Sequence, residues 1–274
     1  DDLLRQMQRL EKYGSGDMIA RRLVHSAGVF DTLNVDMIFN FPRQSEASLN
    51  RDLRILTKEI GVDQVSWYPL MSASSTRRPM RQHMGGDVDR SRERALYQMI
   101  ASHMLVAGYQ RSSAWCFSRQ PGLIDEYIVE HDEYVGLGSG SFSYLQGQLF
   151  ASTFSINHYC RLVGSGQTGI VQRRTMSERD QLRYYLLMRL FSGTIDLNAA
   201  EAPFDGRFRR VLWPELAALR TIGAVRWQGD LLELTERGYY LWVVMMREFF
   251  SGVSDLRDEM RHHIAEERFS LQDQ

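Results

Sequence analysis

Residues 33–70 contain the feature that most restricts the fold: two apolar runs separated by an amphipathic segment. The runs are LNVDMIFNF (33–41) and VDQVSWYPL (62–70), and a proline lies at or just after the end of each. The segment between them, 45–61, has four apolar residues at helical spacing: Leu49, Leu53, Leu56 and Ile60. A strand–helix–strand unit with such short connections predicts a right-handed crossover and a parallel sheet.

Helices are predicted on both sides of this unit. Residues 1–13 and 14–28 have apolar residues at helical spacing, with Asp17 as the expected N-cap of the second helix and Gly28 at its end. Residues 91–109 predict a further helix and residues 111–119 a strand. Residues 72–90 are polar, basic and rich in glycine and serine, so we expect a long loop, and long loops are often functional. Its Arg77, Arg78, Arg81 and His83 could clamp carboxylates or simply face solvent.

The composition changes near residues 164–175, after which the chain becomes mainly helical. We therefore expect two domains, 1–165 and 166–274. In the second, the pattern predicts helices at 177–193, 206–223 and 239–250, and a charged tail follows at 254–270. A strand–turn–strand at 224–238, with its turn at 228–230, completes a winged-helix-like arrangement.

Charge and composition exclude several classes of function. The formal net charge is -1, so no global field directs the chain to nucleic acid. The expected hairpin carries Arg226 against Asp230, Glu233 and Glu236, which is unfavourable for contact with phosphates. No apolar run approaches the ~20 residues that span a bilayer, so we expect no membrane insertion. Two cysteines without a secretory signal favour the cytoplasm.

Asp36 is an acid inside the first apolar run, where we expect it to be buried. Two interpretations stay open: a functional acid that faces a ligand at the end of a strand, or a structural acid that pairs with a nearby arginine or caps a helix. The seven histidines are dispersed, and adjacent His262 and His263 do not share a helix face, so no metal site is predicted.

The segment EYVGLGSGSFSYLQG (133–147) places glycines at 136, 138 and 140. A dinucleotide fingerprint requires a helix after the glycines, and the residues that follow here favour a strand. A Walker A motif requires Gly-Lys-Ser/Thr, which is absent. A tight turn, or close backbone approach to a flat ligand, fits this segment better.

The chain begins at Asp1 without methionine, and apolar residues already recur at helical spacing from Leu3. This start predicts that the sequence is a fragment of a longer protein.

Three segments together resemble the oxygen-independent coproporphyrinogen III oxidase-like family of radical S-adenosylmethionine (AdoMet) enzymes. They are LNVDMIFNFPRQSEASLNRDL (33–53), DEYVGLGSGSFSYLQG (132–147) and the region from Leu182 to Leu241. The resemblance implies an α/β fold, in which the C-terminal part of a partial (βα)6 radical-AdoMet barrel is followed by a mostly helical, winged-helix-like domain.

Within that family the chain is most similar to the branch that degrades haem anaerobically, the anaerobilin synthases. The segments that carry this similarity are VSWYPLM, SAWCFSR, GSGSFSYL and FFSGVSDLRDEMR. Other branches usually have Gly-Leu-Pro where this chain has Asn40-Phe41-Pro42, and often have histidine where it has Phe142. The resemblance implies methyl transfer to haem, ring opening and iron release. The alternatives are a haem chaperone and a coproporphyrinogen III dehydrogenase. A DNA-binding protein is the least favoured alternative.

The resemblance also implies two cofactors, AdoMet and a [4Fe–4S] cluster. The family holds the cluster by a Cys-x3-Cys-x2-Cys loop. This chain lacks that loop, and Cys116 and Cys160 do not replace it. We therefore expect the ligands upstream of Asp1, and we expect the parent protein to be an enzyme while this fragment alone is inactive.

The resemblance assigns roles to two groups of residues and none to a catalytic residue. The first group would contact AdoMet: Arg9, Asp36, Tyr68, Leu70 and Met71. The second would line the tetrapyrrole side of the cavity: Gly136, Gly138, Ser139, Gly140 and Phe142. The implied partners are haem or a related tetrapyrrole and an electron donor such as flavodoxin.

Overall fold

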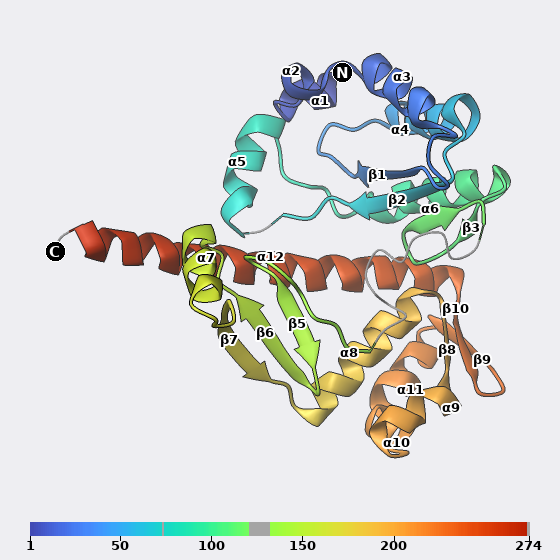
Figure 1. The fold of residues 1–274 in the computed structure, drawn as a ribbon. Helices are drawn as coiled ribbons and strands as arrows, with labels where there is room; N and C mark the ends of the chain where they lie inside the picture. The colour runs from blue at the N-terminus through green and yellow to red at the C-terminus, as the bar shows by residue number, and fades with distance from the viewer. Residues whose placement is uncertain (73, 121–131, 273–274) are drawn as a thin grey trace. The chain divides into compact units, whose positions relative to one another are not determined.

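The computed structural model describes residues 1–72, 74–120 and 132–272, with side chains left out at 76, 79 and 262–272. The chain divides into two compact units (Figure 1). Unit 1 comprises Asp1–Ile124 and Tyr239–Arg247, and unit 2 comprises Asp125–Gly238 and Glu248–Gln274. In the described part of the chain, no helix is long and apolar enough to cross a membrane.

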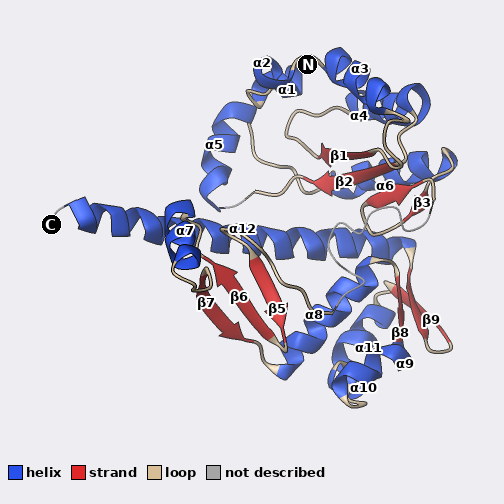
Figure 2. Cartoon of the chain, in the orientation of Figure 1, coloured by secondary structure: helices blue, strands red, loops and turns tan. Residues whose placement is uncertain are grey.

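The sheet of unit 1 confirms the predicted parallel strand pair. Its strands are β1 (Asn34–Phe39), β2 (Gln64–Pro69), β4 (Cys116–Ser118) and β3 (Gln110–Arg111), in the order β1-β2-β4-β3. β1 and β2 are parallel, with Asp36 opposite Ser66 and Phe39 opposite Pro69. β4 is antiparallel to both β2 and β3, so the strand predicted at 111–119 is in fact two short strands. Figure 2 shows these strands in red.

The connection between β1 and β2 is the predicted helix. It consists of α4 (Glu46–Arg54) and a π-helical continuation, η1 (Ile55–Ile60), which ends at Gly61 in a left-handed conformation. Ser45 caps α4 by accepting a hydrogen bond from the backbone N–H of Ser48. Leu49, Leu53 and Leu56 are buried, as their spacing predicts. α6 (Glu93–Val106) confirms the next predicted helix, with Leu96, Ile100 and Met104 in the core.

The structure corrects the loop predicted at 72–90, where residues Ser74–Met84 form helix α5. Met84 is buried with Phe41 and Leu70, and Met80 packs against the same cluster. Because these methionines lie four residues apart, one helix face covers the cluster. Burial of that face outweighs the polar composition from which the loop was predicted.

The N-terminal region also differs from the prediction. Residues 1–13 form two short helices, α1 (Asp2–Gln6) and α2 (Leu10–Tyr13), because Gln8 adopts a left-handed conformation between them. The N-cap of α3 (Gly16–Ser26) is Ser15 rather than Asp17, since the Ser15 hydroxyl accepts from the N–H of Met18. Asp17 lies in the first turn, where an acid still interacts favourably with the helix dipole.

Unit 2 contains a three-stranded antiparallel sheet in the order β5-β6-β7. Its strands are β5 (Phe142–Leu145), β6 (Gln148–Ser152) and β7 (Ile170–Thr175), and α7 (Ile156–Gly164) connects the last two. Ser155 caps α7 through the N–H of His158. β7 lies beyond the predicted domain boundary at 165/166 and pairs with β6 across it. The division into domains 1–165 and 166–274 stays a prediction.

The remainder of unit 2 is mainly helical and contains the predicted hairpin. Its elements in order are α8 (Glu178–Phe191), β8 (Thr194–Asp196), α9 (Leu197–Glu201), η2 (Ala202–Phe204), α10 (Phe208–Val211), α11 (Trp213–Thr221), β9 (Val225–Gln228) and β10 (Leu231–Leu234). The helix predicted at 206–223 is divided in two, with Pro214 in the first turn of α11. The comparison with a winged helix stays a prediction.

The last helix, α12 (Glu236–Gln272), is longer than predicted. We expected a helix at 239–250 followed by a charged tail, and the structure continues the helix through that tail. The polar residues of 254–261, Arg257 and Arg261 among them, are therefore side chains of a helix surface.

Candidate functional site

The carboxyl end of β1 in unit 1 contains an unusual residue, Asn40. Its φ is 69°, in the left-handed region that few residues other than glycine adopt, and it is buried. Its N–H donates to Gln44 Oε1 at 2.8 Å, and its Nδ2 donates to the carbonyl of Asp89 at 3.1 Å. Among the described residues Asn40 Oδ1 has no hydrogen-bond partner. A buried acceptor without a partner costs about 1–3 kcal/mol, so we regard Oδ1 as a candidate contact for a bound group.

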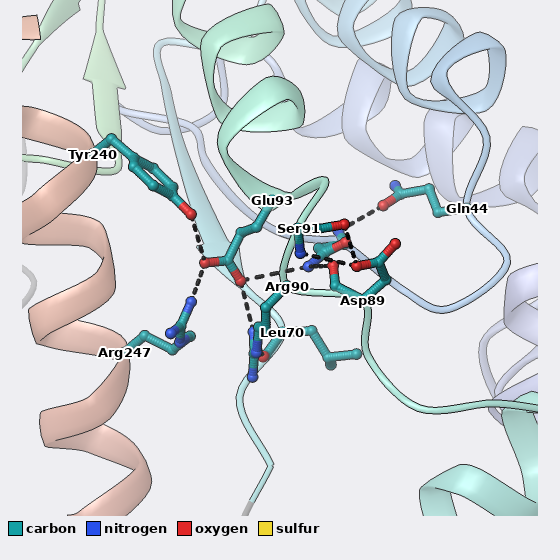
Figure 3. A network of polar contacts seen from close by, with 9 residues as sticks. Gln44, Leu70, Asp89, Arg90, Ser91, Glu93, Tyr240 and Arg247 are labelled. Atoms are coloured by element: carbon teal, nitrogen blue, oxygen red, sulfur yellow. Dashed lines mark hydrogen bonds and ion pairs between the residues drawn. The ribbon is translucent and has the colours of Figure 1, made fainter. Parts of the chain in front are cut away.

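Next to Asn40, the carboxylate of Glu93 lies at the start of α6 and is fully buried. Arg90 donates to its Oε2 at 2.6 Å, and Tyr240 donates to its Oε1 at 3.4 Å (Figure 3). Arg247 forms an ion pair with the same Oε1. Arg90 also donates to the carbonyl of Leu70 at 3.0 Å. The network therefore joins the end of β2 to the beginning of α6.

The charge of Glu93 affects its neighbours. Burial raises the pKa of the Tyr240 hydroxyl, and the negative charge of Glu93 raises it further. Tyr240 therefore stays neutral and acts as a donor to the carboxylate at physiological pH. The two arginines compensate the buried charge, because an unpaired buried carboxylate would be far more costly.

The structure corrects the expectation that Asp36 is buried. Asp36 lies in the middle of β1 and is exposed, and it accepts a hydrogen bond from Asn34 Nδ2 at 3.1 Å. Successive side chains of a strand point to opposite faces. The side chain of Asp36 therefore points to the face of β1 opposite Phe39, and it is exposed. An exposed carboxylate on an apolar strand does not require an arginine partner.

Three of the other residues predicted to contact AdoMet, Tyr68, Leu70 and Met71, lie at the carboxyl end of β2. Leu70 donates its N–H to the carbonyl of Phe39 at 2.9 Å and Met71 follows it, half-buried. Tyr68 packs against Trp115, with 5.4 Å between ring centres.

Arg9 is exposed, 5.9 Å from the ring centre of Tyr13. Leu3 and Met7, which precede Arg9, pack against the cluster that contains Leu70. The polypeptide brings these segments together, and their contact with AdoMet stays a prediction.

The glycine-rich turn lies in unit 2, and its backbone donors are already engaged. The N–H of Gly136 donates to Ser143 Oγ at 3.0 Å, that of Gly138 to Tyr159 Oη at 3.2 Å, and that of Gly140 to the carbonyl of Thr153 at 2.9 Å. Ser139 Oγ donates to the same carbonyl at 2.8 Å. A phosphate-binding loop needs such N–H groups free, so this turn is not built for one.

Phe142 and Phe154 pack closely against this turn. Their rings meet edge to face with 6.3 Å between centres. A Cβ atom on Gly140 would lie 2.9 Å from the Phe154 ring, and one on Gly136 would overlap the carbonyl oxygen of Phe142. Both glycines are therefore required for close packing. The role of this turn in binding a tetrapyrrole stays a prediction.

The described residues do not fit a [4Fe–4S] cluster. Such a cluster requires several closely spaced thiolates. Cys116 is buried in β4 of unit 1, whereas Cys160 is exposed on α7 of unit 2. Among the side chains that the structure describes, no group of three or more histidine, cysteine or acidic residues could hold a metal ion. We therefore derive no chemical step through a cluster from this chain.

Sequence reasoning missed Glu93 and Arg247 and gave Asn40 no role in a site. Glu93 resembles an ordinary first-turn acid, and its partner is more than 150 residues away in the sequence. The sequence could have predicted the left-handed conformation of Asn40, because asparagine in a turn after a strand often adopts that conformation.

Two comparisons place this geometry among known proteins. A solved structure, the coproporphyrinogen III oxidase (HemN) from Escherichia coli, described as a radical SAM enzyme, matches with a TM-score of 0.68 and 16% identity. The match covers 91% of this chain and 62% of the other. This chain shares the fold of HemN.

The curated heme chaperone HemW of Lactococcus lactis subsp. lactis (strain IL1403) is 20% identical to this chain over 221 residues. The alignment covers 77% of this chain and 56% of HemW, so the chain spans about half the length of that relative. No protein-family model matches the sequence.

Proposed function

We propose that this chain belongs to a radical-AdoMet-type protein that binds a tetrapyrrole, with haem as the preferred ligand. The observation that supports this most strongly is the agreement of two comparisons. The fold matches that of HemN over nearly the whole chain, and the sequence is similar to HemW. One of these proteins is named for coproporphyrinogen and the other for haem, and both ligands are tetrapyrroles.

AdoMet would be held at the carboxyl ends of β1 and β2. Asn40 Oδ1 is a buried acceptor without a described partner and could receive a hydrogen bond from the cofactor. The exposed Asp36 carboxylate could accept from ribose hydroxyls, and Arg9 could pair with the methionine carboxylate.

Leu70 and Met71 would contact the adenine, and Tyr68 would support them from β2 by its packing against Trp115. Bound AdoMet would supply a methyl group or a carbon radical.

For the reaction itself we propose anaerobic haem degradation by methyl transfer and ring opening, with an electron donor such as flavodoxin. This finer proposal rests on sequence features alone, among them Asn40-Phe41-Pro42 and Phe142. A haem chaperone is the second candidate, because the curated relative is one. A coproporphyrinogen III dehydrogenase is the third, because HemN has the matching fold.

The deciding experiment uses the complete protein that contains this chain. It is purified anaerobically, reconstituted with iron and sulfide, and incubated with haem, AdoMet and a reductant. Loss of the haem absorption band with release of iron supports degradation. Tight binding of unchanged haem supports the chaperone, and conversion of coproporphyrinogen supports the dehydrogenase. A protein that binds neither tetrapyrrole contradicts the whole proposal.

A coding sequence without three closely spaced cysteines would contradict the radical-AdoMet part separately. In that case the tetrapyrrole part would still be decided by the binding measurement.

A further inference from the structure

Unit 2 carries a group of four side chains that we term the aromatic–arginine cluster: Phe142, Phe154, Arg257 and Arg261. The guanidinium carbon of Arg257 lies 5.5 Å from the ring centre of Phe142, and that of Arg261 lies 5.4 Å from the ring centre of Phe154. The two rings contact each other edge to face. Two cation–π pairs therefore lie next to each other beside the glycine-rich turn.

The spacing of the two arginines matches a ligand with two anionic groups. Arg257 and Arg261 are four residues apart on α12, so their Cβ atoms lie about 5–6 Å apart on one helix face. A guanidinium that lies against a ring keeps its N–H groups in a fixed plane. This plane suits bidentate binding of a carboxylate, which lysine cannot provide in the same way.

Among the side chains that the structure describes, Arg257 has no carboxylate partner, in contrast to other arginines of unit 2. Among the described side chains Arg257 forms no ion pair, and the one carboxylate paired with Arg261 is that of Asp258, at 3.5 Å. By contrast, Arg179 and Arg183 both pair with Glu215 at 2.9 Å or less. Arg257 is also exposed, so an external anion can reach it.

The segment that carries the two phenylalanines has no acids, whereas α12, which carries the two arginines, also carries Asp255, Asp258 and Glu259. Residues 134–177, which form the glycine-rich turn, β5, β6, α7 and β7, contain no aspartate or glutamate. The same segment contains Arg161, Arg173 and Arg174, all exposed. Because the whole chain has a net charge of -1, this local excess of positive charge is a property of the region and not of the protein.

Apolar side chains of the glycine-rich turn are exposed as well. Val135 is 64% exposed and Leu137 is 87% exposed. Large apolar side chains this exposed, next to small residues, leave room for a flat hydrophobic ligand to cover them. A ligand that combines a flat apolar body with two neighbouring carboxylates would use both features.

We propose that the aromatic–arginine cluster binds two neighbouring propionate-type carboxylates of a tetrapyrrole, while the macrocycle covers the glycine-rich turn. This inference rests on the proposed tetrapyrrole function and extends it to the residues that recognise the carboxylates. Arg257 contributes more than Arg261, because Asp258 partly neutralises Arg261.

The test compares two ligands and a set of variants of the 274-residue chain. The ligands are haem and haem dimethyl ester, in which both carboxylates are blocked, each titrated in the same detergent by absorbance and tryptophan quenching. The variants are Arg257→Gln and Arg261→Gln. Arg220→Gln is the matched control, since Arg220 is an exposed arginine of unit 2 that lies 5.6 Å from the ring centre of Trp227.

We expect the unmodified chain to bind haem about tenfold more tightly than the ester, the size of one charge-assisted hydrogen bond. Arg257→Gln should remove most of this difference, Arg261→Gln a smaller part and Arg220→Gln none. Equal affinity of the unmodified chain for haem and the ester overturns the inference but leaves the proposed function standing. Failure to bind either ligand, together with failure of the complete protein to bind a tetrapyrrole, overturns the proposed function itself.

The comparison of ligands on the unmodified chain does not depend on any variant folding. Circular dichroism of each variant shows whether a loss of affinity follows from misfolding. If Arg257→Gln folds normally and keeps the full preference for haem, the guanidinium merely covers the Phe142 ring and the inference is wrong.

Discussion

Arg247 forms an ion pair with Glu93, whose carboxylate is fully buried, and Arg247 itself is buried too. Removal of one member of such a pair leaves an uncompensated charge in the interior, which typically costs about 3–5 kcal/mol. We therefore expect Arg247→Met to lower the free energy of unfolding by about that amount. Urea denaturation monitored by tryptophan fluorescence measures the change.

The control for this pair is Glu59→Gln, which removes an exposed ion pair with Arg54. We expect a change below about 1 kcal/mol, since solvent screens exposed pairs. Similar effects of the two substitutions would show that the Glu93–Arg247 pair is not the reason for the loss.

Asn40 offers a test of backbone strain. Both Asn40→Gly and Asn40→Ala remove the hydrogen bond to Asp89, but only glycine adopts a φ of 69° without penalty. We expect Asn40→Ala to be less stable than Asn40→Gly by about 1–2 kcal/mol. Equal stability in urea would mean that the left-handed conformation is not retained in solution.

The glycine-rich turn allows a matched pair of substitutions. Gly138 and Gly140 both have positive φ, so alanine is strained at either position. A Cβ on Gly140 would also lie 2.9 Å from the Phe154 ring, whereas no atom lies within 4 Å of one on Gly138. We expect Gly140→Ala to destabilise the chain by about 1–3 kcal/mol more than Gly138→Ala. Thermal unfolding of the two variants gives the difference, and a larger loss for Gly138→Ala would contradict the packing described here.

His103 predicts a dependence of stability on pH. Burial lowers the pKa of His103, with a further contribution from the positive charge of Lys58, and its ring lies 3.1 Å from the Thr57 hydroxyl. As the pH falls below about 6.5, the unfolded chain takes up a proton at this residue before the folded chain does. The stability contributed by the neutral ring is therefore present above that pH and is lost as the pH falls.

We expect His103→Gln to reduce the loss of stability between pH 7.5 and pH 5.5. Urea denaturation of both proteins across that range measures it. His25→Gln serves as the control, because His25 is exposed. An unchanged pH profile in His103→Gln would exclude His103 as the titrating group.

Asp36 provides a test of the proposed AdoMet site. In the complete protein we expect Asp36→Ala to weaken AdoMet binding about tenfold, because one charge-assisted hydrogen bond is lost. Since Asp36 is exposed, its removal should leave thermal stability nearly unchanged. Isothermal titration measures the affinity, with the exposed Asp17→Ala as the matched control. Unaltered AdoMet affinity would refute the role proposed for Asp36.

Sequence patterns were sufficient where one helix face or one strand pair decides the structure. The spacing of Leu49, Leu53 and Leu56 predicted α4 and its burial, and Gly61 marked the end of its π-helical continuation. The hairpin of β9 and β10 was predicted from a turn that does contain Gly229 at positive φ. These features are local, so composition and periodicity determine them.

Sequence patterns failed where burial depends on residues far away in the chain. Met80 and Met84 make α5 a helix because they meet Phe41 and Leu70, a cluster that no window of neighbouring residues reveals. Asp36 is exposed in the fold, although its neighbours in the sequence are apolar.

The sequence by itself determined the parallel β1–β2 pair, the connecting helix and a glycine-rich turn that is not a phosphate loop. Only the tertiary structure decided that Glu93 meets Arg247, that Asn40 is held buried in a left-handed conformation, and that Arg257 and Arg261 lie over two phenylalanine rings. The physical reason is that the pairing of charges and rings depends on distances through space. Residues remote in the sequence become neighbours only when the hydrophobic core brings their segments together.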